Sequence, residues 1–198
     1  MSGEDFGAGN LKRKRSIGQF TATSSKPKKY SRLLYRLAKW HNPKYALELG
    51  TALGLSTIYQ ASGFNDTQFI TLEGNSVLAT KARHNLDTFN FKDVEIIEGN
   101  FDKTLIIALE KFPQLDWVFF DGNHQKIPTL KYFHLCMEKA SDTALFIFDD
   151  INWSGGMQEA WAEIKSHPNV SLTIDLFFLG LVFFEKKRPQ KENLVVRF

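Results

Sequence analysis

Short apolar runs alternate with helix-like stretches from residue 45 onward, and this alternation limits the chain to few folds. The runs are five to seven residues long, as β-strands are, and occupy residues 45–49, 69–73, 94–98, 115–121 and 144–149. Helix-like stretches follow them at residues 56–62, 77–89, 103–111, 127–140 and 157–165. Repeated βα units predict a doubly wound α/β fold, in which helices cover both faces of a mostly parallel sheet.

The C-terminal part of the chain has a different pattern. Residues 171–178 and 181–186 are two strand-like runs separated by a tight connection around Gly180. Such a short separation predicts a hairpin. We therefore expect a seven-stranded sheet whose C-terminal strand is antiparallel to its neighbour.

The N-terminal part is divided into an arm and a helix. Residues 1–28 are rich in Gly, Ser, Thr and Lys and predict an irregular arm, in which residues 5–10 form a Gly-rich turn. Beyond the arm, Leu33, Leu34, Leu37 and Trp40 recur at helical spacing, which predicts a docking helix that ends near Pro43. Residues 1–44 thus precede a single domain of residues 45–198.

Charge is distributed unevenly along the chain. Residues 1–45 contain eleven Lys and Arg against two acids, whereas the remainder contains fourteen against twenty. The two parts therefore carry +9 and −6. A basic arm can contact nucleic acid, an acidic substrate or the chain's own acidic body. Because the basic runs at residues 12–15 and 26–29 are short and lack interleaved aromatics, a solvated or intramolecular role is favoured.

Several protein classes are disfavoured by composition. No apolar stretch reaches the roughly 18–20 residues that span a bilayer. The polar, basic N-terminus also lacks the apolar segment of a secretory signal. Cys136 is the single cysteine, so the chain has no internal disulfide framework. These features predict a cytoplasmic protein without membrane contact.

Most of the predicted parallel strands end in a carboxylate or in a glycine-bearing turn. In doubly wound sheets, ligands bind beyond the carboxyl ends of the strands. We therefore expect the active site at this rim, near the strand ends Leu49-Gly50, Leu72-Glu73, Ile97-Glu98-Gly99, Phe120-Asp121 and Phe148-Asp149.

The turn after the first strand is the first candidate ligand-binding segment. Gly50 and Gly54 allow the backbone to turn sharply and to approach a ligand closely. The turn opens a helix whose N-terminal amides favour an anionic group. Its glycine spacing differs from the dinucleotide pattern G-x-G-x-x-G and from the P-loop. Glu73, at the end of the second strand, is placed to accept hydrogen bonds from a ribose diol.

Taken in order, these motifs resemble those of class I S-adenosylmethionine-dependent methyltransferases. The similarity is greatest to catechol O-methyltransferase-like enzymes and their small bacterial relatives, which have a Rossmann-like sheet. It covers roughly residues 45–186. It rests on residues 48–56 (ELGTALGLS), Glu73, Glu98-Gly99-Asn100 and residues 119–124 (FFDGNH).

The resemblance implies a set of cofactor contacts. Around Glu48, the turn residues Gly50, Thr51, Gly54 and Ser56 would contact the methionine part of S-adenosyl-L-methionine. The ribose hydroxyls would be held by Glu73 beside Gly74. The adenine would lie between Asn100 and Phe101, after Gly99, and Asp121 would face the methionine or sulfonium end.

A metal site is also implied. Asp121, Asp149 and Asp150 follow two strands that we expect to be neighbours, and hard cations such as Mg²⁺ prefer oxygen ligands. In the catechol-type enzymes the matching positions bind Mg²⁺, but they have Asn where this chain has Asp150. The alternative is that Asp149 and Asp150 cap the next segment or bind structural partners.

His124, three residues after Asp121, is the candidate general base. The related enzymes have a lysine at this spacing, and histidine can replace it because its ordinary pKa of about 6.5 lies near working pH. A purely structural role for His124 is the alternative. Asn152 and Trp153 are candidates for an acceptor pocket.

The predicted function is transfer of a methyl group from S-adenosylmethionine to a small-molecule hydroxyl. One alternative is a nucleic-acid methyltransferase that uses the basic arm. Methylation of base amino groups is disfavoured because residues 121–124 read DGNH rather than an Asn/Asp-Pro-Pro-aromatic motif. A second alternative is a non-catalytic nucleoside-binding module of the same fold. The sequence leaves a homodimer and the identity of the acceptor open.

Overall fold

The computed structural model describes residues 28–185 and 190–198. The predicted arm up to residue 27, including the Gly-rich turn at residues 5–10 and the basic run at residues 12–15, lies outside the described residues. The division of the chain at residue 44 therefore stays a prediction.

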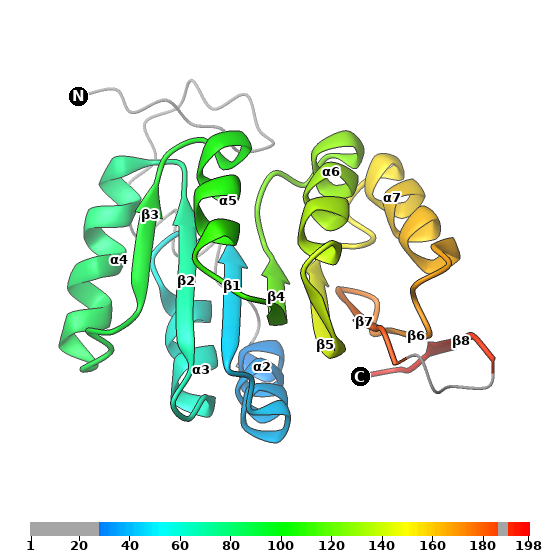
Figure 1. Ribbon diagram of the computed structural model, residues 1–198, viewed down its shortest axis with the longest axis horizontal. Helices are drawn as coiled ribbons and strands as arrows, with labels where there is room; N and C mark the ends of the chain where they lie inside the picture. The colour runs from blue at the N-terminus through cyan, green and yellow to red at the C-terminus, as the bar shows by residue number, and fades with distance from the viewer. Residues whose placement is uncertain (1–27, 186–189) are drawn as a thin grey trace.

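One sheet organises the described part of the chain (Figure 1). Its strand order is β3-β2-β1-β4-β5-β7-β6-β8, and β7 alone among the described strands runs antiparallel to its neighbours. Chain order reverses between β1 and β4, which is where a doubly wound sheet binds its ligand. The strands are β1 (Tyr45–Leu49), β2 (Gln68–Glu73), β3 (Glu95–Glu98), β4 (Leu115–Phe120), β5 (Ala140–Asp149), β6 (Leu172–Asp175), β7 (Leu179–Phe183) and β8 (Glu192–Val195).

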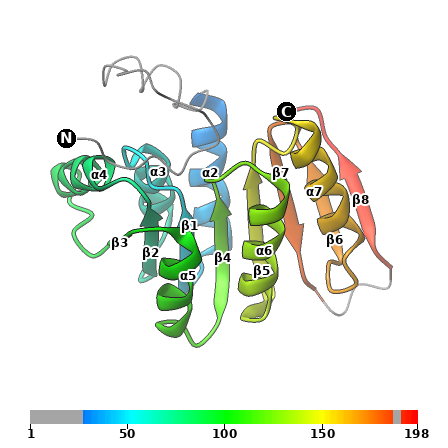
Figure 2. The same cartoon turned by 90° about the horizontal axis from the view of Figure 1, so that it is seen from above.

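Helices cover both faces of the sheet, as the βα alternation predicts (Figure 2). Buried residues of α2 and α4 belong to one core cluster, and those of α5, α6 and α7 belong to the other. The helices are α2 (Lys28–His41), α3 (Leu55–Gly63), α4 (Ser76–Thr88), α5 (Phe101–Glu110), α6 (Lys126–Met137) and α7 (Gly155–Ser166). The predicted α/β fold with a mostly parallel sheet is confirmed.

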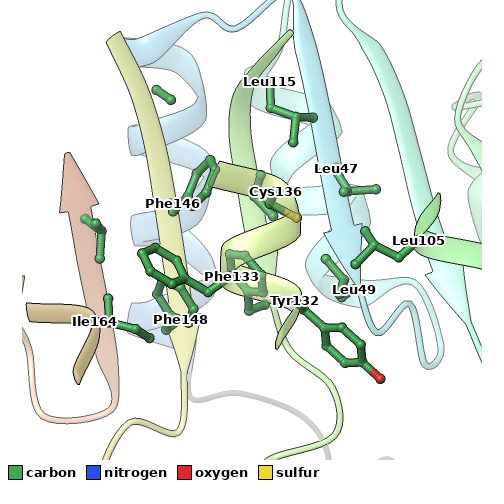
Figure 3. Close-up of a cluster of buried hydrophobic side chains, with 14 of the residues drawn as sticks. Leu47, Leu49, Leu105, Leu115, Tyr132, Phe133, Cys136, Phe146, Phe148 and Ile164 are labelled. Carbon is green, nitrogen blue, oxygen red and sulfur yellow. The ribbon is translucent and has the colours of Figure 1, made fainter. Parts of the chain in front are cut away.

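The central strands supply side chains to both core clusters, which explains why their sequences are mostly apolar. In β4, Phe119 packs in the cluster beneath α2 while its neighbour Phe120 packs in the cluster beneath α6. Phe120 stacks on Phe148 of β5 at a centroid distance of 4.2 Å. Figure 3 shows the second cluster, in which Phe133 and Cys136 of α6 lie against the sheet. Burial raises the pKa of the Cys136 thiol, so this residue is a packing residue.

The C-terminal hairpin differs from the prediction in its turn. The connection lies at residues 176–178, and Gly180 belongs to β7. A Cβ at Gly180 would lie 2.6 Å from the ring of Trp161, so this glycine is needed for packing against α7. The predicted number of seven strands is also wrong. An eighth strand, β8, pairs parallel to β6 at the sheet edge.

Helix α2 docks on the sheet through its apolar face. Tyr30, Leu34 and Ala38 are buried, and the main chain of α2 approaches α3 closely at Gly63. A Cβ at Gly63 would lie 2.6 Å from the carbonyl oxygen of Tyr35. Within residues 28–185 and 190–198, no helix combines the length and apolar character needed to cross a membrane.

Candidate functional site

A cavity of about 340 Å³ lies at the carboxyl ends of the parallel strands. This volume falls within the range of small-molecule sites. The walls come from the turns after β1, β2, β3 and β4 and from the start of α6. They are formed by Gly50, Ala52, Glu73, Gly74, Asn75, Leu78, Asn100, Phe101, Asp102, Asp121, Gly122, Asn123, Gln125, Pro128 and Tyr132.

The turn after β1 brings the ends of β1 and β4 into close contact. The Asp121 N–H donates to the Leu49 carbonyl at 2.8 Å, and the Gly50 N–H donates to the Leu72 carbonyl at 2.9 Å. Gly50 has φ +107°, and a Cβ there would lie 2.2 Å from the Asp121 carbonyl oxygen. Both the backbone angle and the space therefore require glycine.

Glu73 is fixed at the cavity wall by two backbone amides. The Ala52 N–H donates to Oε2 at 2.7 Å, and the Asn75 N–H donates to Oε1 at 2.8 Å. The residue is 8% exposed and lines the cavity. Each oxygen of an ionised carboxylate can accept a further hydrogen bond. The two backbone bonds therefore fix the position and orientation of the Glu73 carboxylate at the cavity wall.

Glu48 lies behind the cavity wall rather than in it. Its carboxylate is fully buried and accepts from Ser56, Thr57, Gln60 and Thr71 at 2.5–2.8 Å. Burial raises the pKa of the Glu48 carboxyl, while these four hydrogen bonds act in the opposite direction.

The network around Glu48 reaches the turn after β1 through the hydroxyls of Thr71 and Thr51. Because Thr71 donates to Glu48, the hydroxyl of Thr51 is the donor in its 2.7 Å bond to Thr71. On the other side, the Trp117 indole donates to Gln60 at 2.8 Å. This buried network therefore ties the turn to β2, α3 and β4. Its members support the turn from behind.

The predicted adenine end is built where β3 meets α5. Asn100 caps α5 by accepting the Asp102 N–H at 2.8 Å, and Phe101 lines the cavity. A Cβ at Gly122 would lie 2.7 Å from the Phe101 ring, so the β4 turn packs tightly on that ring. The Phe101 and Tyr132 rings meet edge to face at 6.1 Å.

Tyr132 connects this end of the cavity to the core. Its ring belongs to the core cluster beneath α6, and its hydroxyl points away from that cluster in Figure 3. The hydroxyl donates to Asp102 Oδ1 at 3.2 Å, and Lys131 donates to the same oxygen at 2.8 Å. The Lys131 ammonium lowers the pKa of Asp102, whereas burial raises the pKa of Tyr132. This wall of the cavity therefore contains an ionised Asp102 carboxylate and a neutral Tyr132 phenol.

The ends of β4 and β5 bring together a second group of side chains. His124 Nε2 lies 3.9 Å from Asp121 Oδ1 and 3.8 Å from Asp150 Oδ2. The His124, Asp121 and Asp150 side chains are 21%, 19% and 29% exposed, so solvent reaches all three. Asp121 also lines the cavity and therefore belongs to both groups.

The predicted metal ligands do not form a ligand group. Asp121 and Asp150 flank His124, and Asp149 is buried at the end of β5. Within residues 28–185 and 190–198, no three His, Cys, Asp or Glu side chains are arranged to hold a metal ion. We therefore assign no chemical step to a cation, and the Mg²⁺ site stays a prediction.

The predicted cofactor residues divide into two sets. Gly50, Glu73, Gly74, Asn100, Phe101 and Asp121 line the cavity. The others lie outside its wall and support it: Glu48, Thr51, Gly54, Ser56 and Gly99. The roles of all eleven stay predictions.

Sequence reasoning missed the cavity residues from α4 and α6. Asn75, a helix-capping residue two positions after Glu73, accepts the Val77 and Leu78 N–H groups. Its residue type before a helix is a recognisable signal. Gln125, Pro128 and Tyr132 gave no such signal, because their place at the cavity depends on how α6 packs.

Outside the cavity, two exposed aromatics stand near the aspartates of β5. Trp153 is 69% exposed, and Phe177 in the β6–β7 turn is 63% exposed. Asn152 joins the two loops, since its amide donates to the Phe177 carbonyl at 2.8 Å. Asn152 and Trp153 lie in the loop after β5 and outside the cavity wall, and their acceptor role stays a prediction.

Fold and site together define a doubly wound α/β protein with a small-molecule cavity at its topological switch point. Comparison with known families agrees: residues 47–151 match the family described as "Methyltransferase domain". This match spans more than half of the chain, so the chain belongs to the methyltransferase domain family. The resemblance and the enzyme class predicted from the sequence are confirmed.

Solved structures show the same fold. The O-methyltransferase from Bacillus cereus in complex with SAH is 25% identical, with a TM-score of 0.70, and the match covers 88% of this chain and 93% of that one. The O-methyltransferase TomG from Streptomyces achromogenes in complex with SAM is 20% identical, with a TM-score of 0.71 and coverage of 88% and 92%. SAH-bound PaMTH1 from Podospora anserina is 17% identical, with a TM-score of 0.72 and coverage of 83% and 82%.

Proposed function

We propose that this chain transfers a methyl group from S-adenosylmethionine to a hydroxyl oxygen of a small-molecule acceptor. The observation that carries the proposal is that the Gly50 turn and the Glu73 carboxylate line one cavity, with Glu73 held by two backbone amides. The related Bacillus cereus O-methyltransferase is described in complex with SAH, the demethylated form of this cofactor.

The residue types of the cavity fit the cofactor. Glu73 offers two fixed acceptor oxygens, which suits a ribose diol. Phe101 offers an aromatic face and Asp102 a carboxylate, which suit a purine ring with an amino group. Gly50 leaves room for close approach to the main chain. When bound, the cofactor supplies the electrophilic methyl carbon.

On the acceptor side, His124 would take the proton of the hydroxyl. A neutral imidazole can accept a proton, and the positive charge would then lie between the carboxylates of Asp121 and Asp150. Coulomb attraction from both sides stabilises that charge. General-base contacts are often long before a substrate binds and shorten in the complex, so separations of 3.8–3.9 Å are compatible with this role.

Calorimetric titration with SAH tests the cofactor half of the proposal. Glu73→Gln should weaken SAH binding by about 1–3 kcal/mol if the carboxylate holds the ribose. The control is Glu98→Gln, because Glu98 pairs with Glu73 in the sheet but does not line the cavity. Unchanged SAH affinity in folded Glu73→Gln protein, or tight NAD binding without SAH binding, would overturn the proposal.

Product detection tests the transfer itself. SAH release should be followed with S-adenosylmethionine and a panel of hydroxyl compounds, with added Mg²⁺ in one arm and a chelator in the other. Release that depends on a hydroxyl acceptor supports O-methyl transfer, and loss of that release with the chelator would support the predicted cation. Cofactor binding without SAH release for any acceptor would identify a non-catalytic nucleoside-binding module.

A further inference from the structure

Helix α2 lies on the outside of the molecule (Figure 2), and one of its faces is basic and exposed. It contains five Lys or Arg and no Asp or Glu, and all five basic residues are exposed. At 100° per residue they fall within an arc of about 100°, opposite the buried face. The members of this basic face are Lys28, Lys29, Arg32, Arg36 and Lys39.

The basic face is held rigidly on the body. At one end of α2, the Tyr30 hydroxyl donates to the Leu176 carbonyl at 3.5 Å. At the other end, the His41 ring donates to the Asp116 carbonyl at 2.9 Å. The close crossing at Gly63 fixes the middle of the helix. The main chain of α2 therefore fixes the positions from which the five cationic side chains extend.

Most of this charge has no acidic partner within the described part of the chain. None of the ion pairs between described residues includes Arg32, Arg36 or Lys39. The Lys29 ammonium is already engaged, since it donates to the main-chain oxygen of Phe198 at 2.6 Å. The row is thus available to a negatively charged partner, although residues 46–198 carry a formal charge of −6.

Two features favour nucleic acid over an anionic membrane. Interfacial helices bind membranes by burying an apolar face, and that face of α2 is already packed on the sheet. At the C-terminal end of the basic face, Trp40 is 68% exposed, and aromatic side chains beside cations are stacking platforms for unpaired bases.

The length of the row also suits a nucleic-acid strand. From Lys28 to Lys39 the helix rises about 16 Å. Phosphates follow one another at about 3.4 Å along the axis of each strand in a duplex, so a stacked strand presents about five phosphates over that length. Five cations can therefore face a comparable number of phosphates.

We propose that the basic face of α2 binds the phosphate backbone of single-stranded nucleic acid, with Trp40 stacking on a base. This interaction is independent of the proposed methyl transfer. It needs neither the cavity nor His124.

The test is fluorescence anisotropy of a short labelled single-stranded RNA with the full chain, between 50 and 200 mM salt. Arg32→Gln/Arg36→Gln should raise the Kd about ten-fold and lower the salt slope by about 1.4, which corresponds to two lost phosphate contacts on a single strand. The matched control is Lys92→Gln/Lys103→Gln, which removes the same charge from two exposed lysines elsewhere. It should change the Kd less than two-fold.

A second variant tests the stacking contact. Trp40→Ala should weaken binding of the single strand about five-fold or more and leave binding of a duplex of the same sequence unchanged, because paired bases are not available to stack. All variants should keep the unfolding midpoint and the SAH affinity of the parent chain, which separates this result from failure of the methyl-transfer proposal.

Three outcomes would overturn the proposal. The first is an equal loss of RNA binding in the α2 variant and in its charge-matched control, which would mean that only net charge matters. The second is absence of RNA binding by the full chain at physiological salt. The third is α2-dependent binding to phosphatidylserine vesicles without RNA binding, which would identify a membrane surface instead.

Discussion

At the end of β2, both oxygens of Glu73 accept backbone hydrogen bonds of 2.7–2.8 Å, whereas at the ends of β4 and β5 the His124 ring lies 3.8–3.9 Å from its two aspartates. The first region is supported from behind by the buried Glu48 network, and the second is open to solvent. The difference shows that the region that we propose for the cofactor is preorganised by the fold. The region that we propose for the acceptor holds the His124 ring at ion-pair distance from two carboxylates.

This difference predicts that substitutions in the two regions change different measurable properties of the protein. In the cofactor region they should change stability and SAH affinity together, because the same hydrogen bonds serve both. In the acceptor region they should change the rate and leave SAH affinity intact.

Gly50→Ala should have the largest effect in the cofactor region. Its Cβ would lie 2.2 Å from the Asp121 carbonyl at a backbone angle that alanine rarely adopts. We expect the free energy of unfolding to fall by about 4 kcal/mol, with loss of SAH binding, as measured by urea denaturation and calorimetry.

The control for this change is Gly155→Ala, where nothing lies within 4 Å of the added Cβ. That variant should be unchanged or more stable by about 0.4–1 kcal/mol. Equal stability of the two variants would contradict the inference that only glycine fits at position 50, where the ends of β1 and β4 meet.

His124→Asn should give the next largest effect, and only on the rate. Removing a general base lowers the rate by about 10²-fold or more, equivalent to about 2.7 kcal/mol. Single-turnover assays should show this loss while SAH affinity stays within about two-fold. His84→Asn, on the exposed side of α4, is the control and should keep the full rate. A rate loss shared by both variants, or a parallel loss of SAH affinity, would remove the distinction between the two regions.

Glu48→Gln should have the smallest effect of the three. The amide nitrogen would face hydroxyl donors that now bond to a carboxylate oxygen, so we expect a loss of about 2 kcal/mol in the free energy of unfolding. Glu110→Gln, an exposed acid at the end of α5, should change it by less than about 0.5 kcal/mol.

The same variant has a pH signature. Because burial raises the folded-state pKa of Glu48 above its usual 4.5, the folded chain takes up a proton at a pH where the unfolded chain does not. The stability from this uptake is fully present below pH 4.5 and is lost as pH rises through the folded-state pKa. The stability difference between the parent chain and Glu48→Gln should therefore widen as pH falls from 7.5 towards 5. A constant difference in urea titrations would show that the raised pKa is wrong.

The fold could be predicted from the sequence mainly where burial is nearly complete. The central strands lie between two helix layers, so residues 115–120 are buried throughout and apolar except for Asp116. Strand β8 could not be found in this way. Its four residues, Glu-Asn-Leu-Val, are mostly exposed and depend on β6 for their pairing. The sequence predicts a turn at Gly180, whereas the structure places this residue in β7. The reason for the glycine, its packing against Trp161, lies on a separate helix and is not visible in the local sequence.

The cavity residues could be predicted where they directly follow or end a strand of the sheet. Gly50 and Glu73 sit directly at strand ends, and the cavity includes both. Glu48 is two residues from Gly50 and yet faces Thr71 and α3, because the side chain points into the layer behind the turn. Tyr132 enters the cavity through the packing of α6, which no local pattern encodes.

The bond from the Lys29 ammonium to the main-chain oxygen of Phe198 places Phe198 beside the start of α2, where its ring also lies 5.6 Å from that of Tyr30. The charge of a side chain at position 198 would therefore act directly on the basic face. An acidic side chain introduced there, as in Phe198→Asp, would serve as a built-in competitor for phosphate.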